Sequence, residues 1–85
     1  MITIKANIGS HGIVIHPDSF LGFVIDRDDN KNILFGIIEG MGKVEFGLVE
    51  DFDKTLMKCK ETLRKIKNEP DSEYLLSSET GWLVK

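Results

Sequence analysis

Hydrophobic residues recur every three or four positions across residues 51–68, and this spacing places them along one face of a helix. The residues that share this apolar stripe are Val49, Phe52, Leu56, Cys59, Leu63 and Ile66. Asp51 or Asp53 can cap the first turn, because a carboxylate oxygen accepts hydrogen bonds from the free N–H groups there. Pro70 prevents the helix from continuing. The pattern therefore predicts an amphipathic helix near residues 51–68 whose apolar stripe faces the core.

Five hydrophobic runs precede the helix, and short polar or glycine-containing turns separate them. Alternating or β-branched runs of this length are typical of strands. The predicted strands are residues 2–8, 13–15, 20–25, 33–38 and 43–49. Short turns join the last three strands, so these predict an antiparallel meander. After the helix, residues 74–84 predict a short C-terminal hairpin, with Trp82 either closing one end of the core or anchoring an interface.

Two of the predicted strands, residues 20–25 and 33–38, are apolar on both faces. The helix would cover one face, and the other face needs cover from the terminal segments or from a second subunit. We therefore predict a single α+β domain over residues 1–85, in which a small, mainly antiparallel sheet is packed by one amphipathic helix. The same observation predicts a homodimer or a higher homo-oligomer, because a symmetric pair is the commonest closed assembly.

The charge of the chain is unevenly distributed. Residues 54–67 carry six cations and one acid, whereas the rest of the chain carries five cations and thirteen acids, for a net charge of −3. This layout argues against a general nucleic-acid binder, because most of the surface would repel phosphates. No hydrophobic run approaches the length of a membrane span, and the first residues do not resemble a signal peptide. The sequence therefore predicts a cytoplasmic protein without membrane contact.

The helix carries most of its cations away from the apolar stripe. Like charges stand four residues apart at two places, which weakens a helix by roughly 0.2–0.5 kcal/mol per pair. One interpretation is a solvated face that carboxylates of the turn at residues 26–29 neutralise. The other is a contact surface for a partner, with Met57 as an apolar anchor between the cations. The predicted partner-binding residues are Lys54, Met57, Lys58, Lys60, Arg64 and Lys65.

Other candidate chemistry is sparse. Ser10 and His11 lie in a small-residue loop that could bind an anion through backbone N–H groups, although it lacks the lysine of a phosphate-binding loop. His11 and His16 stand five residues apart with only Asp18 nearby, so no metal site is predicted. The single cysteine, Cys59, lies on the apolar stripe and is predicted to be a buried, inert thiol. No convincing catalytic set is present, and the sequence predicts neither an enzyme nor a cofactor.

These features favour a small non-enzymatic binding protein that occupies or inhibits a macromolecular partner. Inhibitors, immunity proteins, antitoxins and phage-encoded anti-defence proteins act in this way. The predicted partner is a protein with an acidic surface, because the helix is cationic. Two alternatives remain open: an oligomeric protein that sequesters a small anionic ligand such as a nucleotide, and an accessory protein that binds nucleic acid through the basic helix.

Overall fold

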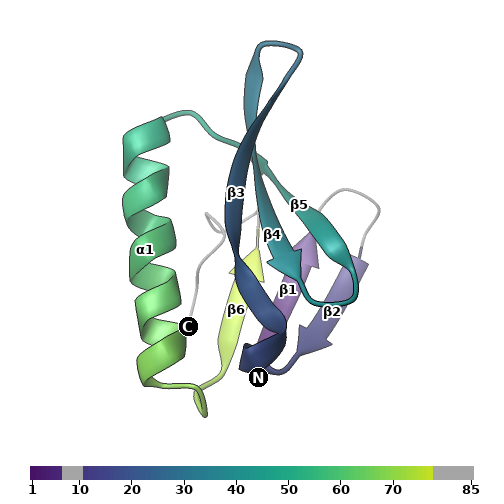
Figure 1. The fold of residues 1–85 in the computed structure, drawn as a ribbon, viewed down its shortest axis with the longest axis vertical. Coiled ribbons are helices and arrows are strands. Elements are labelled where there is room, and N and C mark those ends of the chain that lie inside the picture. The colour runs from purple at the N-terminus through teal and green to yellow at the C-terminus, as the bar shows by residue number, and fades with distance from the viewer. Residues whose placement is uncertain (7–10, 78–85) are drawn as a thin grey trace.

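The computed structural model describes residues 1–6 and 11–77, apart from the side chains of Ala6 and His11, and it confirms the α+β class (Figure 1). Its elements in chain order are β1 (Ile2–Ala6), β2 (His11–Ile15), the 3₁₀ turn η1 (Pro17–Ser19), β3 (Phe20–Asp28), β4 (Lys31–Ile38), β5 (Gly42–Leu48), α1 (Phe52–Asn68) and β6 (Tyr74–Ser77). The strands form two three-stranded sheets, ordered β2-β1-β6 and β3-β4-β5. Along the chain, α1 and β6 come after the three strands of the β3-β4-β5 sheet.

The β3-β4-β5 sheet is the predicted antiparallel meander. Asp29 and Asn30 form the turn between β3 and β4, and both have positive φ, 48° and 65°. A two-residue hairpin turn with positive φ at both positions matches the right-handed twist of the strands, and aspartate and asparagine tolerate this conformation. The strands therefore extend further into the polar run at residues 26–32 than the sequence predicted.

The β2-β1-β6 sheet differs from the prediction of one sheet and a C-terminal hairpin. β6 pairs with β1 in parallel, with Ile2 opposite Tyr74 and Ile4 opposite Leu76. Parallel strands need a long crossover connection, and the meander and α1 supply it here. The partner strand of the predicted hairpin and Trp82 lie outside the described residues.

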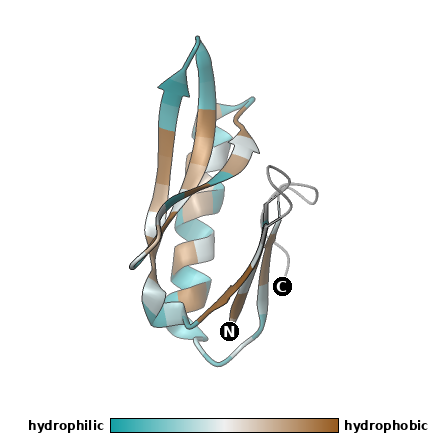
Figure 2. Cartoon of the chain, turned by 90° about the vertical axis from the view of Figure 1, so that its right-hand side faces the viewer, coloured by the Kyte–Doolittle hydropathy of each residue, from teal (hydrophilic) through white to brown (hydrophobic). Residues whose placement is uncertain are grey.

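The core lies between the two sheets, which converge near the N-terminus and diverge away from it (Figure 2). α1 runs beside β3 and closes one side of the wedge (Figure 1). The buried hydrophobic residues come from both sheets and from the helix: Ile2, Ile4, Phe20, Leu34, Ile38, Phe46, Cys59, Ile66, Tyr74 and Leu76. One hydrophobic cluster therefore joins both sheets and the helix.

Both ends of α1 are satisfied by local hydrogen bonds. The Asp51 carboxylate accepts from the backbone N–H of Lys54 at 3.0 Å, which confirms the predicted N-cap. At the other end, the Tyr74 hydroxyl lies 2.9 Å from the carbonyl of Lys65 and 2.7 Å from that of Glu69. A hydroxyl has one proton to donate, so the two carbonyls share it. Tyr74 thus ties the end of the helix to the start of β6.

Candidate functional site

The face that α1 presents to the core coincides only in part with the predicted stripe, since Cys59 and Ile66 are buried as predicted. Cys59, Thr62 and Ile66 are its buried residues. Phe52, Leu56 and Leu63, which belong to the predicted stripe, are 47%, 38% and 37% exposed. At about 100° per residue, the buried face is turned by roughly 45° from the middle of the apolar stripe. The prediction that the whole stripe is core is therefore wrong.

Thr62 shows how the helix accommodates this rotation. Its side chain is fully buried, and its hydroxyl donates to the carbonyl of Lys58 at 2.7 Å. A threonine that bonds within its own helix leaves no buried polar group unsatisfied. Small side chains at positions 59 and 62 also let the helix approach the sheets closely. We infer that the larger Phe52, Leu56 and Leu63 are displaced to the flank for this reason.

The predicted partner-binding residues remain together on the exposed side of α1. We call them the cationic ridge: Lys54, Met57, Lys58, Lys60, Arg64 and Lys65. All six are exposed, and Met57 is 63% exposed. Met57 lies on the side of the helix directly opposite the buried face. No ridge cation has a carboxylate within ion-pair distance among the described residues. The ridge is therefore a group of five exposed cations around Met57, and Glu61, the one acid among residues 54–67, lies on the same face of the helix.

The acidic turn does not neutralise this ridge. Asp26 instead pairs with Lys43 at 3.2 Å, and the Lys43 ammonium lies 4.7 Å from the centre of the Phe35 ring. The hydrogen bond from Lys43 and that from the backbone N–H of Arg27 lower the pKa of the Asp26 carboxyl below its ordinary value. Asp29 lies at the tip of the β3–β4 hairpin, which projects beyond the start of α1 (Figure 1). Neither carboxylate therefore forms an ion pair with the ridge, and a solvated face and a contact surface stay the two interpretations of these cations.

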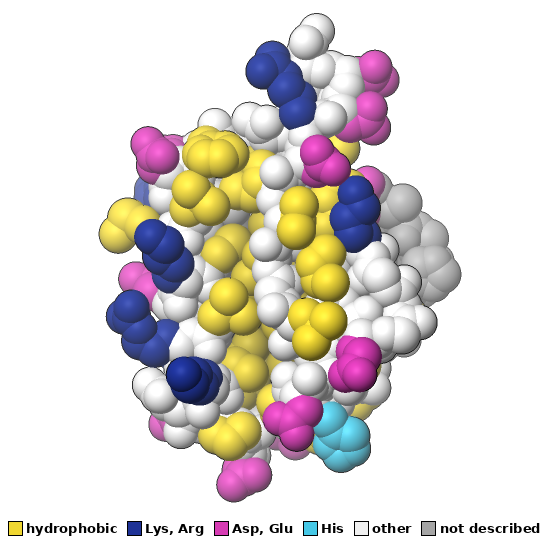
Figure 3. All heavy atoms as spheres, viewed as in Figure 1, with side chains coloured by type: hydrophobic (Ala, Val, Ile, Leu, Met, Phe, Trp, Pro, Cys, Tyr) yellow, Lys and Arg dark blue, Asp and Glu magenta, His cyan; other side chains and the backbone are white. Residues whose placement is uncertain are grey.

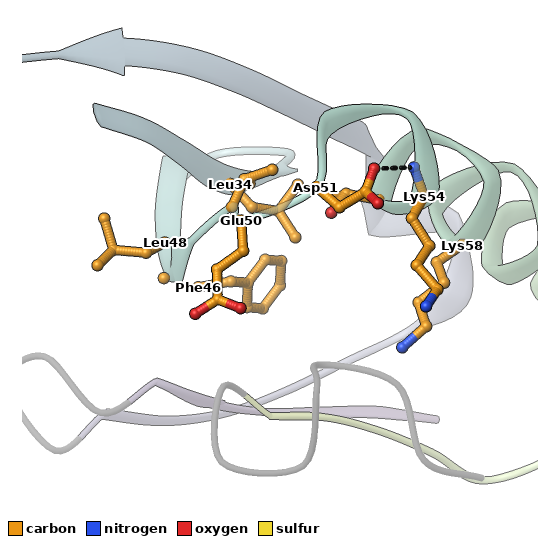
Figure 4. A pocket seen from close by; sticks show the side chains of 10 residues that line it. Leu34, Phe46, Leu48, Glu50, Asp51, Lys54 and Lys58 are labelled. Atoms are coloured by element: carbon orange, nitrogen blue, oxygen red, sulfur yellow. Dashed lines mark hydrogen bonds between the residues drawn. The ribbon is translucent and has the colours of Figure 1, made fainter. Parts of the chain in front are cut away.

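A pocket of about 370 Å³ opens between the first turns of α1 and the end of β5. Its lining residues are Leu34, Phe46, Gly47, Leu48, Val49, Glu50, Asp51, Lys54, Thr55 and Lys58. Figure 4 shows the ammonium groups of Lys54 and Lys58 and the carboxylate of Glu50 projecting in the same direction, toward the side on which the β2-β1-β6 sheet is drawn. The pocket therefore combines apolar walls with charged groups of both signs. Sequence reasoning missed it, because its walls come from separate strands.

The other predicted ligand site cannot be placed in the same detail. Ser10 and the side chain of His11 lie outside the described residues. Within residues 1–6 and 11–77, no cluster of three or more His, Cys, Asp and Glu side chains is arranged to hold a metal ion. The same part of the chain has no helix that combines the length and hydrophobicity needed to cross a membrane. Comparisons with family models, curated proteins and solved structures gave no match.

Cys59 is expected to react slowly with thiol reagents in the native protein. Its side chain is 6% exposed, and burial raises the pKa of the thiol from 9.0 to about 11. Because the thiolate is the reactive form, labelling at pH 8 should be slow in buffer and fast in denaturant. Unfolding releases the thiol to its ordinary pKa, so stability should fall as the pH rises from 9 to 11. Rapid native labelling would contradict the burial of this face.

Proposed function

We propose that this chain is a non-enzymatic binding protein that occupies an acidic surface on a protein partner through the cationic ridge. The observation that carries the proposal is that five exposed cations gather on one side of α1, none of them in an ion pair with a described residue. Like charges four residues apart, such as Lys54 and Lys58, repel each other and lower the stability of the helix, so helix stability does not explain their presence. An external acidic surface supplies the missing partners.

The ridge combines two features of a binding surface: charges that speed association, and an apolar side chain that loses its water when the partner binds. A band of one charge attracts an oppositely charged surface and raises the association rate. Met57 adds a flexible, polarisable side chain at the middle of the band, and burying it contributes apolar contact that the charges do not. Blocking a partner in this way needs no catalytic group. It is the mode of action of inhibitors, immunity proteins, antitoxins and anti-defence proteins, and we place this chain with them, in the cytoplasm and as a self-associating protein.

The ridge triple, Lys54→Gln, Lys58→Gln and Lys65→Gln, tests the proposal against a control triple, Lys5→Gln, Arg27→Gln and Lys31→Gln. All six side chains are exposed, and each triple removes three positive charges. The ridge triple should keep or slightly raise the melting temperature, because it removes a like-charge pair worth about 0.2–0.5 kcal/mol. Its capture of partner from an extract of the native host should fall at least about tenfold, whereas the control triple should capture normally.

Two outcomes would contradict this proposal. If the folded ridge triple captures as much partner as the wild-type protein, the ridge is ordinary solvated surface. If the wild-type protein captures nucleic acid instead and the ridge triple loses it, the helix is a nucleic-acid contact. A parallel measurement with free duplex DNA separates the two classes of partner, because both respond to the loss of cations.

The pocket at the start of α1 favours a second candidate function, the sequestering of a small anionic ligand. Lys54 and Lys58 stand at its mouth and Phe46 forms part of its wall, so a ligand with an anionic group and an apolar or aromatic body fits the chemistry. This pocket is a further candidate location for that function, because Ser10 and the side chain of His11 in the glycine-containing loop lie outside the described residues. Mass spectrometry of molecules released from the purified protein on denaturation tests it. A nucleotide recovered in equimolar amount would favour this candidate over the ridge proposal.

A further inference from the structure

We propose that the pocket at the start of α1 binds a small zwitterion, a molecule that carries a carboxylate, an ammonium group and an apolar side chain. Free apolar amino acids are the simplest molecules of this class. The proposal rests on the second candidate function and narrows it, because it names the class of ligand that the same pocket takes. It does not depend on a protein partner of the ridge.

The inner wall of the pocket is apolar and belongs to the core. Leu34 and Phe46 line it, and their side chains are only 2% and 3% exposed. Val49, which packs against the same core cluster, lines it as well. The volume of about 370 Å³ lies near the small end of the ~300–1,000 Å³ range of ligand pockets. At about 30 Å³ per water molecule, the pocket holds about twelve waters, so it suits a ligand about as large as an apolar amino acid.

Charged groups of both signs line this pocket from different elements. Lys54 and Lys58 are one turn apart on α1, so their side chains lie on one side of the helix. Glu50 precedes the helix, in the connection from β5. Figure 4 shows its carboxylate beside the Phe46 ring and the two ammonium groups on the helix side. None of these three charged groups forms an ion pair with a described residue, so opposite charges stand apart within one pocket.

The other polar groups of the lining fit this arrangement. The Asp51 carboxylate accepts a hydrogen bond from the backbone N–H of Lys54 at 3.0 Å, so it is committed to the helix cap. Thr55 is half-buried, and its hydroxyl forms no hydrogen bond with the described residues. A hydroxyl can both donate and accept, so it can bond to either charged group of a ligand. The pocket therefore offers separate polar partners for a carboxylate and for an ammonium group.

The charge balance of the lining favours a zwitterion over a polyanion. Its four ionisable side chains are two of each sign, so their formal charges sum to zero: Glu50, Asp51, Lys54 and Lys58. A ligand with several negative charges, such as a nucleotide, would be attracted by the lysines and repelled by the two carboxylates. A zwitterion has no net charge, and it can direct its carboxylate to the lysines and its ammonium group to Glu50.

Two of the charged residues belong to both candidate sites. Lys54 and Lys58 are ridge cations, and Figure 3 shows Lys and Arg side chains along the helix side of the molecule. Replacing either lysine would therefore change the ridge and the pocket together. Glu50 lies outside the ridge, so Glu50→Gln tests the pocket alone. Glu39→Gln is the matched control, because Glu39 is also exposed and does not line the pocket.

Isothermal titration calorimetry of the full chain tests the proposal with two amino acids and their analogues. The analogues of L-phenylalanine are hydrocinnamate, which lacks the amino group, and phenethylamine, which lacks the carboxylate. The corresponding analogues of L-leucine are isocaproate and isoamylamine. At least one of the amino acids should bind with a Kd of about 1 mM or lower. Each of its analogues should bind at least about tenfold more weakly, because each loses one charge-assisted contact.

The two variants locate the binding site. Glu50→Gln should weaken binding of the same amino acid at least about tenfold, because the ammonium group loses its carboxylate partner. Glu39→Gln should bind it as the wild-type protein does. Circular dichroism should show both variants folded, and both should still capture the partner of the ridge.

Each other result overturns the proposal in a distinguishable way. If neither amino acid shows saturable binding, the pocket does not take this class of ligand. Equal affinity for an amino acid and its analogue without the amino group, or a nucleotide released from the purified protein, keeps the second candidate function but excludes the zwitterion. Binding that Glu50→Gln leaves unchanged places the ligand outside the pocket. None of these results decides whether the ridge binds a protein, which the capture experiment tests.

Discussion

Ile4→Ala is expected to lower the free energy of unfolding by about 2–5 kcal/mol, the usual cost of truncating a large buried side chain. Ile4 is fully buried in β1, the central strand of its sheet. Truncation removes apolar contacts with both neighbouring strands and leaves a cavity where the two sheets meet. A loss of this size is a large part of the ~5–15 kcal/mol that stabilises a typical domain. Urea unfolding followed by circular dichroism measures it.

Two comparison variants define the specificity of this effect. Val14→Ala, 62% exposed in the adjacent strand, should change stability by less than about 0.5 kcal/mol. Leu56→Ala was expected from the sequence to cost as much as a core truncation, but Leu56 is 38% exposed and should cost clearly less than Ile4→Ala. The melts should be run at one low protein concentration, so that association between copies does not affect the comparison. Equal losses for Leu56→Ala and Ile4→Ala would show that the buried face of α1 is misassigned.

Gly36→Ala is expected to destabilise the protein by about 1–3 kcal/mol through overpacking. A Cβ atom at Gly36 would lie 2.6 Å and 2.9 Å from two ring atoms of Phe46 and 3.2 Å from the ring of Phe20. Both rings belong to the buried core, so neither can move away without disturbing its neighbours. The ring of Phe46 therefore occupies the space that a side chain at position 36 would need.

Gly12→Ala is the matched control for this substitution. Gly12 also lies within a strand, but a Cβ atom there would meet nothing within 4 Å. Its replacement should leave stability unchanged or slightly raise it, because alanine restricts the unfolded chain more than glycine does. Differential scanning calorimetry of both variants gives the comparison. A Gly36→Ala protein as stable as the Gly12→Ala protein would contradict the packing of Phe46 against β4.

The features that the sequence predicted correctly depend on local chemistry. The start of α1 follows from the Asp51 cap, and the meander follows from short turns between hydrophobic runs. The parallel pairing of β1 with β6 could not be predicted in this way, because the paired residues are some seventy positions apart. The hydrophobic pattern of each strand would be the same if it formed a hairpin with a neighbouring strand. Long-range pairing is decided by the whole core rather than by either strand.

The helix illustrates a different limit of hydrophobic patterning. Hydropathy assigns Leu56 and Leu63 to the core and Thr62 to the surface, and the structure reverses this. Thr62 can be buried because its hydroxyl donates a hydrogen bond to the Lys58 carbonyl. A hydropathy scale takes no account of such a bond. The ridge residues could still be named from helical spacing alone. The pocket could not, because Leu34 and Phe46 reach it from different strands.

The ionic-strength dependence of partner association tests the central claim most directly. With a captured protein in hand, stopped-flow mixing gives the association rate of the wild-type protein, the ridge triple and the control triple from low salt to about 0.5 M. If the ridge is the contact surface, the rate of the wild-type protein and of the control triple should fall steeply as salt screens the charges. The ridge triple should start at least about tenfold slower and respond weakly to salt. Equal rates and equal salt slopes for all three proteins would contradict the ridge as the binding surface.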